Sequence, residues 1–183
     1  MKVVFLDIDG VLNQSDYRRE MMKKGHISVI LQREQLALLK KIVDATDASI
    51  VLISSWRKFW RREGSIDSAG QQIEQVLDEY GLFIVDKTPA LHRGSRSDEV
   101  EAWLKNKRYV EQYVILDDND FSWSLKLKSH WVWCPDATGL TDQLADVAIN
   151  ILNGSLNSRE KTRSASLISK MKKCGEWLKC QFK

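Results

Sequence analysis

Short apolar runs alternate along the chain with segments in which apolar residues recur at helical spacing. Runs rich in β-branched residues predict buried strands, at residues 3–6, 50–53, 82–85, 113–116 and 131–133. Apolar positions three or four apart predict amphipathic helices, at residues 32–46, 73–80, 97–104 and 140–152. Strands that alternate with helices indicate βαβ units. We therefore expect an α/β fold, a Rossmann-like three-layer sandwich around a mainly parallel sheet.

This pattern places one domain at residues 1–152 and a separate tail at 153–183. Residues 13–30 are polar and basic, and we expect a short flap or loop there, too small to pack as a domain. The longest other loops are expected at 56–67 and 118–130. The domain would therefore carry no cap, or a minimal one, over the carboxyl ends of its strands.

Composition is that of an ordinary soluble protein, with 43% hydrophobic and 29% charged residues among 183. The three cysteines show no disulfide framework, and neither a secretory leader nor a membrane span is visible, so a cytoplasmic location is expected. The whole chain has a net charge of +3, whereas residues 159–183 carry eight basic and two acidic residues. This basic tail shows approximate helical spacing and is a candidate to contact nucleic acid or an anionic membrane surface.

Polar side chains follow three of the predicted strands. These residues are Asp7-Ile8-Asp9-Gly10, then Ser54-Ser55-Trp56-Arg57, then Asp117-Asp118-Asn119-Asp120. In open α/β sheets, ligands bind at the carboxyl ends of the strands, so the three segments are expected to line one crevice. Asp120 is equally consistent with a helix cap.

The acids of this crevice have a spacing that suits phosphate chemistry. Asp7 and Asp9 lie two residues apart on extended backbone and can face one substrate, and Gly10 allows a sharp turn beside it. Together with Asp117 and Asp118 they would repel one another without a cation. Oxygen ligands from a few carboxylates, with room for water and phosphate, favour Mg²⁺.

The same segments resemble the motifs of a known superfamily. Residues 5–13, ending at Asn13, resemble motif I of the haloacid dehalogenase-like (HAD) superfamily, 51–57 resemble its motif II, and 114–118 its motif IV. More narrowly, residues 2–152 resemble the HAD domains of Swiss Army Knife RNA repair proteins. The segments that support this narrower resemblance are Arg93-Gly94, Glu99-Val100-Glu101-Ala102-Trp103-Leu104 and Gly139-Leu140-Thr141.

The resemblance implies a phosphatase with an aspartyl-phosphate intermediate. Asp7 would be the nucleophile, Asp9 the general acid and base, and Ser54 or Ser55 a ligand of the phosphoryl group. Mg²⁺ would bind to Asp7, the backbone carbonyl of Asp9, and Asp117 or Asp118.

The superfamily also places a cation, its motif III, beside the phosphoryl group. Arg93 is our choice for this role, with Arg96 and Lys87 as rivals. The residues expected to contact the substrate are Gly10, Asn13, Trp56 and Arg57.

An open site favours a macromolecular substrate, either a nucleic-acid end or a phosphoprotein. Basic and aromatic residues alternate over 57–62, which suits a polynucleotide but is equally typical of a solvated helix. Two alternatives remain open at this point. One is a phosphatase of a small phosphorylated metabolite, and the other is a phosphate-binding module without turnover.

Overall fold

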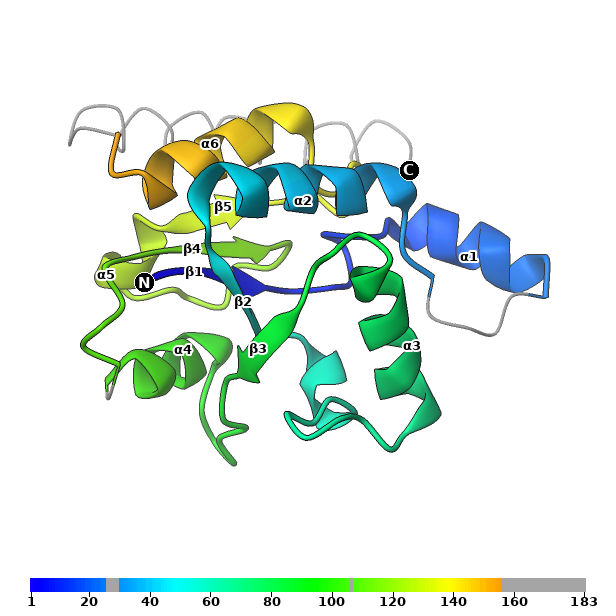
Figure 1. Ribbon diagram of the computed structural model, residues 1–183, viewed down its shortest axis with the longest axis horizontal. Helices are drawn as coiled ribbons and strands as arrows, with labels where there is room; N and C mark the ends of the chain where they lie inside the picture. The colour runs from blue at the N-terminus through cyan, green and yellow to red at the C-terminus, as the bar shows by residue number, and fades with distance from the viewer. Residues whose placement is uncertain (26–29, 106, 156–183) are drawn as a thin grey trace.

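The computed structural model describes residues 1–25, 30–105 and 107–155. Its five strands form one sheet in the order β3-β2-β1-β4-β5, and every pair of neighbours is parallel. The strands are β1 (Lys2–Leu6), β2 (Ser49–Leu52), β3 (Ile84–Lys87), β4 (Gln112–Asp117) and β5 (Trp131–Trp133). Figure 1 shows the sheet between two layers of helices, so the predicted Rossmann-like α/β sandwich is confirmed.

Four of the helices occupy segments where helical spacing predicted them. They are α2 (Arg33–Thr46), α3 (Ser68–Asp78), α4 (Arg96–Lys105) and α6 (Asp142–Leu152). The side chain of Thr141 accepts a hydrogen bond from the backbone N–H of Leu144 and thereby caps α6.

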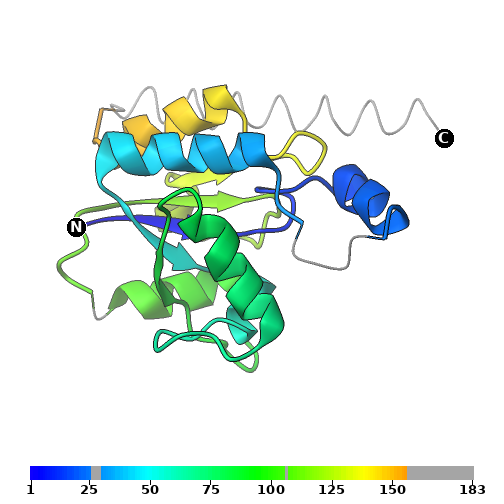
Figure 2. The same cartoon turned by 45° about the vertical axis from the view of Figure 1, so that its right-hand side comes forward.

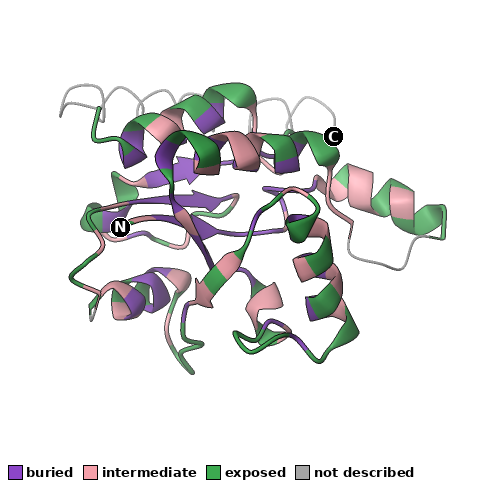
Figure 3. Cartoon of the chain, viewed as in Figure 1, coloured by how far each residue is buried: buried purple, intermediate pink, exposed green. Residues whose placement is uncertain are grey.

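Two buried clusters cover the two faces of the sheet. Side chains of α2, α3 and α6 pack with Val4 and Leu6 on one face, whereas α4 and α5 (Leu125–Lys128) pack with Val3 and Phe5 on the other. Successive side chains of a strand point to opposite faces, so β1 is buried on both sides. Figure 3 shows the central strands as the most buried part of the domain.

Three segments expected as loops contain short helices. The 3₁₀ helix η1 (Ser55–Lys58) follows β2, α5 lies before β5, and α1 (Ser15–Lys23) occupies most of the expected flap. No residue of α1 is buried, which explains why apolar periodicity did not predict it. Figure 2 shows α1 projecting from the domain beside the ends of the central strands.

One strand lies further along the chain than predicted. β3 begins at Ile84 rather than at Leu82, because Gly81 adopts a positive φ of 65° and Leu82 packs into the core before the strand starts. β3 is an edge strand, and Phe83 and Val85 are exposed.

Within residues 1–25, 30–105 and 107–155, no helix combines the length and apolar character needed to cross a membrane. Apart from residues 153–155, the predicted basic tail lies outside the described residues.

Candidate active site

The register of the sheet brings the three polar strand ends together. Leu6 of β1 pairs with Leu52 of β2 and with Leu116 of β4. The residues that follow these leucines therefore emerge at one edge of the sheet. Asp7, Asp117 and Asp118 each offer a carboxylate oxygen there, and these oxygens all lie within 4.8 Å of one another. We call these three residues the acid cluster.

The backbone around the acid cluster is tightly defined. Gly10 has a φ of +79°, and a Cβ at this position would lie 2.6 Å from the Asp118 carboxylate, so only glycine allows this approach. The indole N–H of Trp131 donates to the carbonyl of Asp117, at 3.1 Å, and that of Trp133 to the carbonyl of Asp118, at 2.8 Å. Both tryptophans of β5 thus hold the acidic end of β4.

A single arginine from the start of α4 bridges two members of the acid cluster. The guanidinium of Arg96 lies 3.1 Å from a carboxylate oxygen of Asp7 and 2.6 Å from one of Asp117. Its other side faces the ring of Phe121, with 4.4 Å to the ring centroid. Burial opposes its charge, but the carboxylates of Asp7 and Asp117 outweigh this effect and raise the pKa of Arg96.

The environment of Asp117 and Asp118 disfavours the ionised form of both side chains. Burial, and then the charge of Asp7, raises the pKa of Asp117 to about 7 in spite of Arg96. Burial and the charges of Asp7 and Asp136 raise the pKa of Asp118 to about 6. The cluster therefore holds more negative charge than its protein cation offsets.

This imbalance predicts how the metal-free protein responds to pH. An unfolded Asp has a pKa of about 3.9, so the folded state binds protons that the unfolded chain releases between pH 4 and 7. This binding of protons stabilises the folded state. Its contribution to the free energy of unfolding is complete below about pH 4, and it is lost as the pH rises through the folded pKa values of about 6 for Asp118 and about 7 for Asp117. We expect the melting temperature in chelator to fall from pH 5 to pH 8, and Mg²⁺ to raise it at pH 8.

Thermal unfolding of the wild type and of Asp118→Asn, with chelator or with Mg²⁺, measures both effects. The variant lacks one of the two shifted carboxyl groups, so its melting temperature should depend less on pH and respond less to Mg²⁺. Identical pH and Mg²⁺ dependence in the two proteins would contradict the electrostatics of the cluster.

Asp9 lies beside the acid cluster and is held by three side chains. Its Oδ1 forms an ion pair with the guanidinium of Arg18, at 2.5 Å, and accepts from the side-chain amide of Asn13, at 3.2 Å, while its Oδ2 accepts from the indole N–H of Trp56, at 2.9 Å. Asn13 is buried and also binds the backbone of Gly10 and Ile30. Its described contacts are therefore internal, and they orient the loop that carries Asp9.

The residues after β2 differ in their burial and in their hydrogen-bond partners. Ser54 is buried, and its hydroxyl accepts from the backbone N–H of Trp56 at the start of η1, whereas Ser55 is exposed. Arg57 donates to the carbonyl of Ile53, at 2.6 Å, and to the buried Glu99, at 2.7 Å. Neither of these partners belongs to the acid cluster. Glu99 had no role of its own in the sequence-based prediction, because an acid in the first turn of a helix is ordinary.

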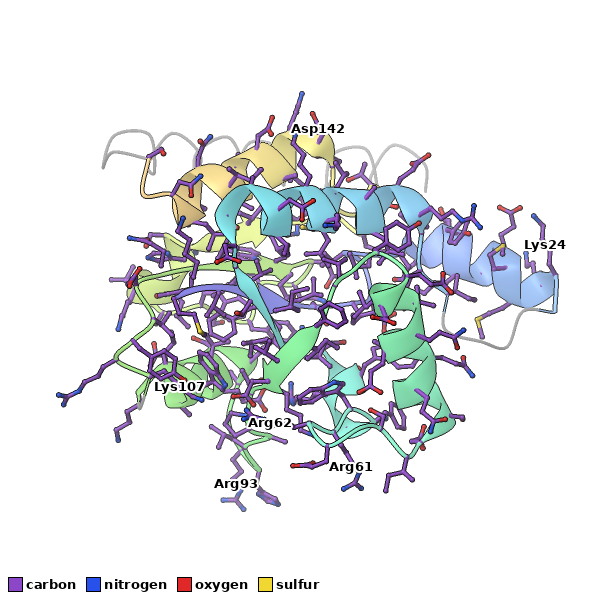
Figure 4. The ribbon with its side chains drawn as sticks, viewed as in Figure 1. Lys24, Arg61, Arg62, Arg93, Lys107 and Asp142 are labelled. Carbon is purple, nitrogen blue, oxygen red and sulfur yellow. The ribbon has the colours of Figure 1, made fainter. Side chains whose placement is uncertain are left out.

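The cation beside the acid cluster differs from the one we chose from the sequence. Arg93 is exposed, and its side chain points away from the domain in Figure 4. Lys87 donates to the carbonyls of Arg57 and Trp60, at 2.9 and 2.6 Å. Arg96 alone of these three contacts the acids, because α4 begins at this residue and directs it toward the ends of β1 and β4.

Asp120 follows the acid cluster but lies outside it. It is exposed, and its carboxylate accepts from the backbone N–H of Ser122, at 3.1 Å, which is a turn contact.

The acid cluster suits a divalent cation with oxygen ligands. Carboxylates within 4.8 Å of one another, two with pKa values raised by burial and like charge, are the donor set that Mg²⁺ prefers. Asp9 lies outside this group of side chains, so only its backbone carbonyl, the ligand expected from the resemblance, remains a candidate.

One family comparison agrees with this geometry. The family described as "HAD domain in Swiss Army Knife RNA repair proteins" matches residues 3–145, which span β1 to the first turn of α6. No curated protein and no solved structure matches the chain. The matched residues include the acid cluster and all of the sheet except Lys2, and the superfamily is one of phosphatases and other hydrolases. The chain therefore belongs to the family of HAD domains found in Swiss Army Knife RNA repair proteins.

Proposed function

We propose that the protein is a Mg²⁺-dependent phosphomonoesterase that acts on the phosphorylated end of a polynucleotide. The observation that carries the proposal is the acid cluster, in which Asp7 lies beside Asp117 and Asp118 at the carboxyl edge of the sheet. Membership of the HAD family supports the chemistry, and the family's description as part of RNA repair proteins supports the substrate class.

In the proposed reaction, a carboxylate oxygen of Asp7 attacks phosphorus in line with the leaving oxygen. The bond from phosphorus to the leaving oxygen breaks, and Asp9 gives that oxygen a proton. Asp9 then takes a proton from water, which attacks the aspartyl-phosphate and frees Asp7 and inorganic phosphate. Mg²⁺, held by Asp7, the Asp9 carbonyl and Asp117 or Asp118, would supply positive charge beside the phosphoryl oxygens.

The other polar residues would bind or support the phosphoryl group. We assign the cationic role to Arg96 in place of Arg93, because the guanidinium of Arg96 already lies 3.1 Å from Asp7. Ser54 would donate to a phosphoryl oxygen, since it directly follows Ile53, whose N–H binds the carbonyl of Leu6 beside Asp7. Trp56 and Asn13 would position Asp9, and Arg57 would tie η1 to α4 through Glu99.

The open surroundings of Asp9 favour a large substrate. Among the described residues, the insert after β1 contributes one helix of nine residues with no buried side chain. The side chain of Asp9 is 34% exposed, and Ser55, which precedes the Trp56 that binds Asp9, is exposed. A chain end can therefore approach without the opening of a domain, whereas a small metabolite would find few groups to enclose it.

A substrate panel tests this proposal. With Mg²⁺ present, we expect kcat/KM for 3′- or 5′-phosphorylated oligonucleotides to exceed that for phosphopeptides, sugar phosphates and an aryl phosphate by at least about tenfold, and chelator to abolish turnover. Preference for phosphopeptides or for a sugar phosphate would overturn the substrate class. Absence of Mg²⁺-dependent release of phosphate from every substrate would favour a binding module instead.

A further inference from the structure

The exposed helix α1 is fixed at its N-terminal end beside Asp9. The backbone N–H and the hydroxyl of Ser15 both donate to Asp136, at 3.0 and 2.9 Å. The side chain of Gln14 donates to the carbonyl of Thr138, at 3.0 Å. These polar contacts with the loop between β5 and α6 hold a helix that buries no residue of its own.

This anchor directs one arginine of α1 at the site. The guanidinium of Arg18 lies 2.5 Å from Asp9 and donates to the hydroxyl of Ser15, at 3.0 Å. These two contacts involve Nη1, which faces Asp9, and Nη2, which donates to Ser15, whereas a guanidinium carries five N–H donors. The side chain is 30% exposed, so the remaining donors can reach a ligand that approaches from solvent.

The role proposed for Asp9 brings the leaving group of the substrate close to Arg18. To exchange a proton with the leaving oxygen, a carboxylate oxygen of Asp9 must lie within hydrogen-bond reach of it. The group that leaves must therefore enter the space next to Asp9, which is where Arg18 lies. Asn13 is buried, whereas Arg18 stands on an exposed helix and can turn from Asp9 to an incoming group.

We propose that Arg18 binds the leaving group of the substrate and selects one that is anionic, namely the phosphodiester next to the terminal phosphate of a polynucleotide. A guanidinium binds phosphate oxygens through two parallel N–H donors, and a neutral leaving group offers no such partner. This inference rests on the proposed function, and it names Arg18 as the residue that selects a polynucleotide as the substrate.

Equilibrium binding separates this role from catalysis. In the Asp7→Asn background, with Mg²⁺ present, the probes are a 3′-phosphorylated trinucleotide and a nucleoside 3′-monophosphate. Arg18→Met should weaken trinucleotide binding by about 10- to 100-fold, the usual effect of losing a charge-assisted contact, and monophosphate binding by no more than about threefold.

Arg19→Met is the matched control on the same helix. The side chain of Arg19 is 65% exposed and pairs with Asp16, and the variant removes the same charge from α1. Affinity for the trinucleotide should therefore fall much less than in Arg18→Met.

Equal losses for both probes, or equal losses in both arginine variants, would overturn the role of Arg18. A wild-type protein that hydrolyses nothing, but shows the expected binding pattern, would refute the phosphatase while leaving the Arg18 site intact. Hydrolysis of oligonucleotides with no selective loss in Arg18→Met would refute the Arg18 site alone.

Discussion

Replacement of Asp7 by Asn should lower kcat of Mg²⁺-dependent hydrolysis by about 10⁴-fold or more, as loss of a covalent nucleophile does in other hydrolases. An amide nitrogen or oxygen does not form a stable acyl-phosphate in place of the carboxylate. The substitution also removes one negative charge from the acid cluster, where the charge of Asp7 raises the pKa of both Asp117 and Asp118. We therefore expect the variant to fold, with a melting temperature in chelator no lower than that of the wild type.

Initial rates with the best substrate of the panel, together with thermal unfolding, measure both effects. Asp16→Asn is the matched control, because the Asp16 side chain is 90% exposed on α1 and its loss should leave the rate on an aryl phosphate unchanged. A rate close to that of the wild type in Asp7→Asn would show that another residue carries the phosphoryl group.

Replacement of Arg96 by Met should have the largest effect on stability. The variant leaves Asp7 and Asp117 without the cation that bridges them, at 3.1 and 2.6 Å. Removal of one partner from a buried ion pair costs about 3–5 kcal/mol of unfolding free energy, and we expect this loss at pH 8 without metal. At pH 5 the loss should be smaller, because Asp117, whose pKa is raised to about 7, is then neutral.

Denaturant unfolding at the two pH values measures this difference, and turnover with Mg²⁺ should fall in the same variant. Arg93→Met is the control, since Arg93 is exposed and its side chain points away from the domain. If Arg93→Met lost activity and Arg96→Met kept it, our first choice from the sequence would be right and the assignment to Arg96 wrong.

The strands were predictable from the sequence because their burial leaves a local signal. Residues 3–6, 50–53 and 113–116 are unbroken apolar runs, as strands covered on both faces require, and each is followed by polar residues. Since parallel strands that end in register expose those residues at one edge, the acid cluster could be anticipated before any coordinates.

Other parts of the site depend on contacts between distant segments. The two arginines at 93 and 96 look equivalent in the sequence, and the start of α4 decides which one reaches the acids. Arg18 belongs to a helix that buries no residue, whose position depends on Asp136, 121 residues from Ser15. No local pattern predicts such a contact.

The claim that the acid cluster binds a divalent cation is tested most directly in a crystal of the protein soaked with Mn²⁺. The anomalous scattering of Mn²⁺ locates the bound ion. We predict one strong peak among the carboxylates of Asp7, Asp117 and Asp118, about 2.0–2.3 Å from the oxygens that bind it, and its loss when Asp117 and Asp118 are both replaced by Asn. A well-ordered site with no peak there, in a protein whose turnover survives chelation, would contradict the proposed chemistry.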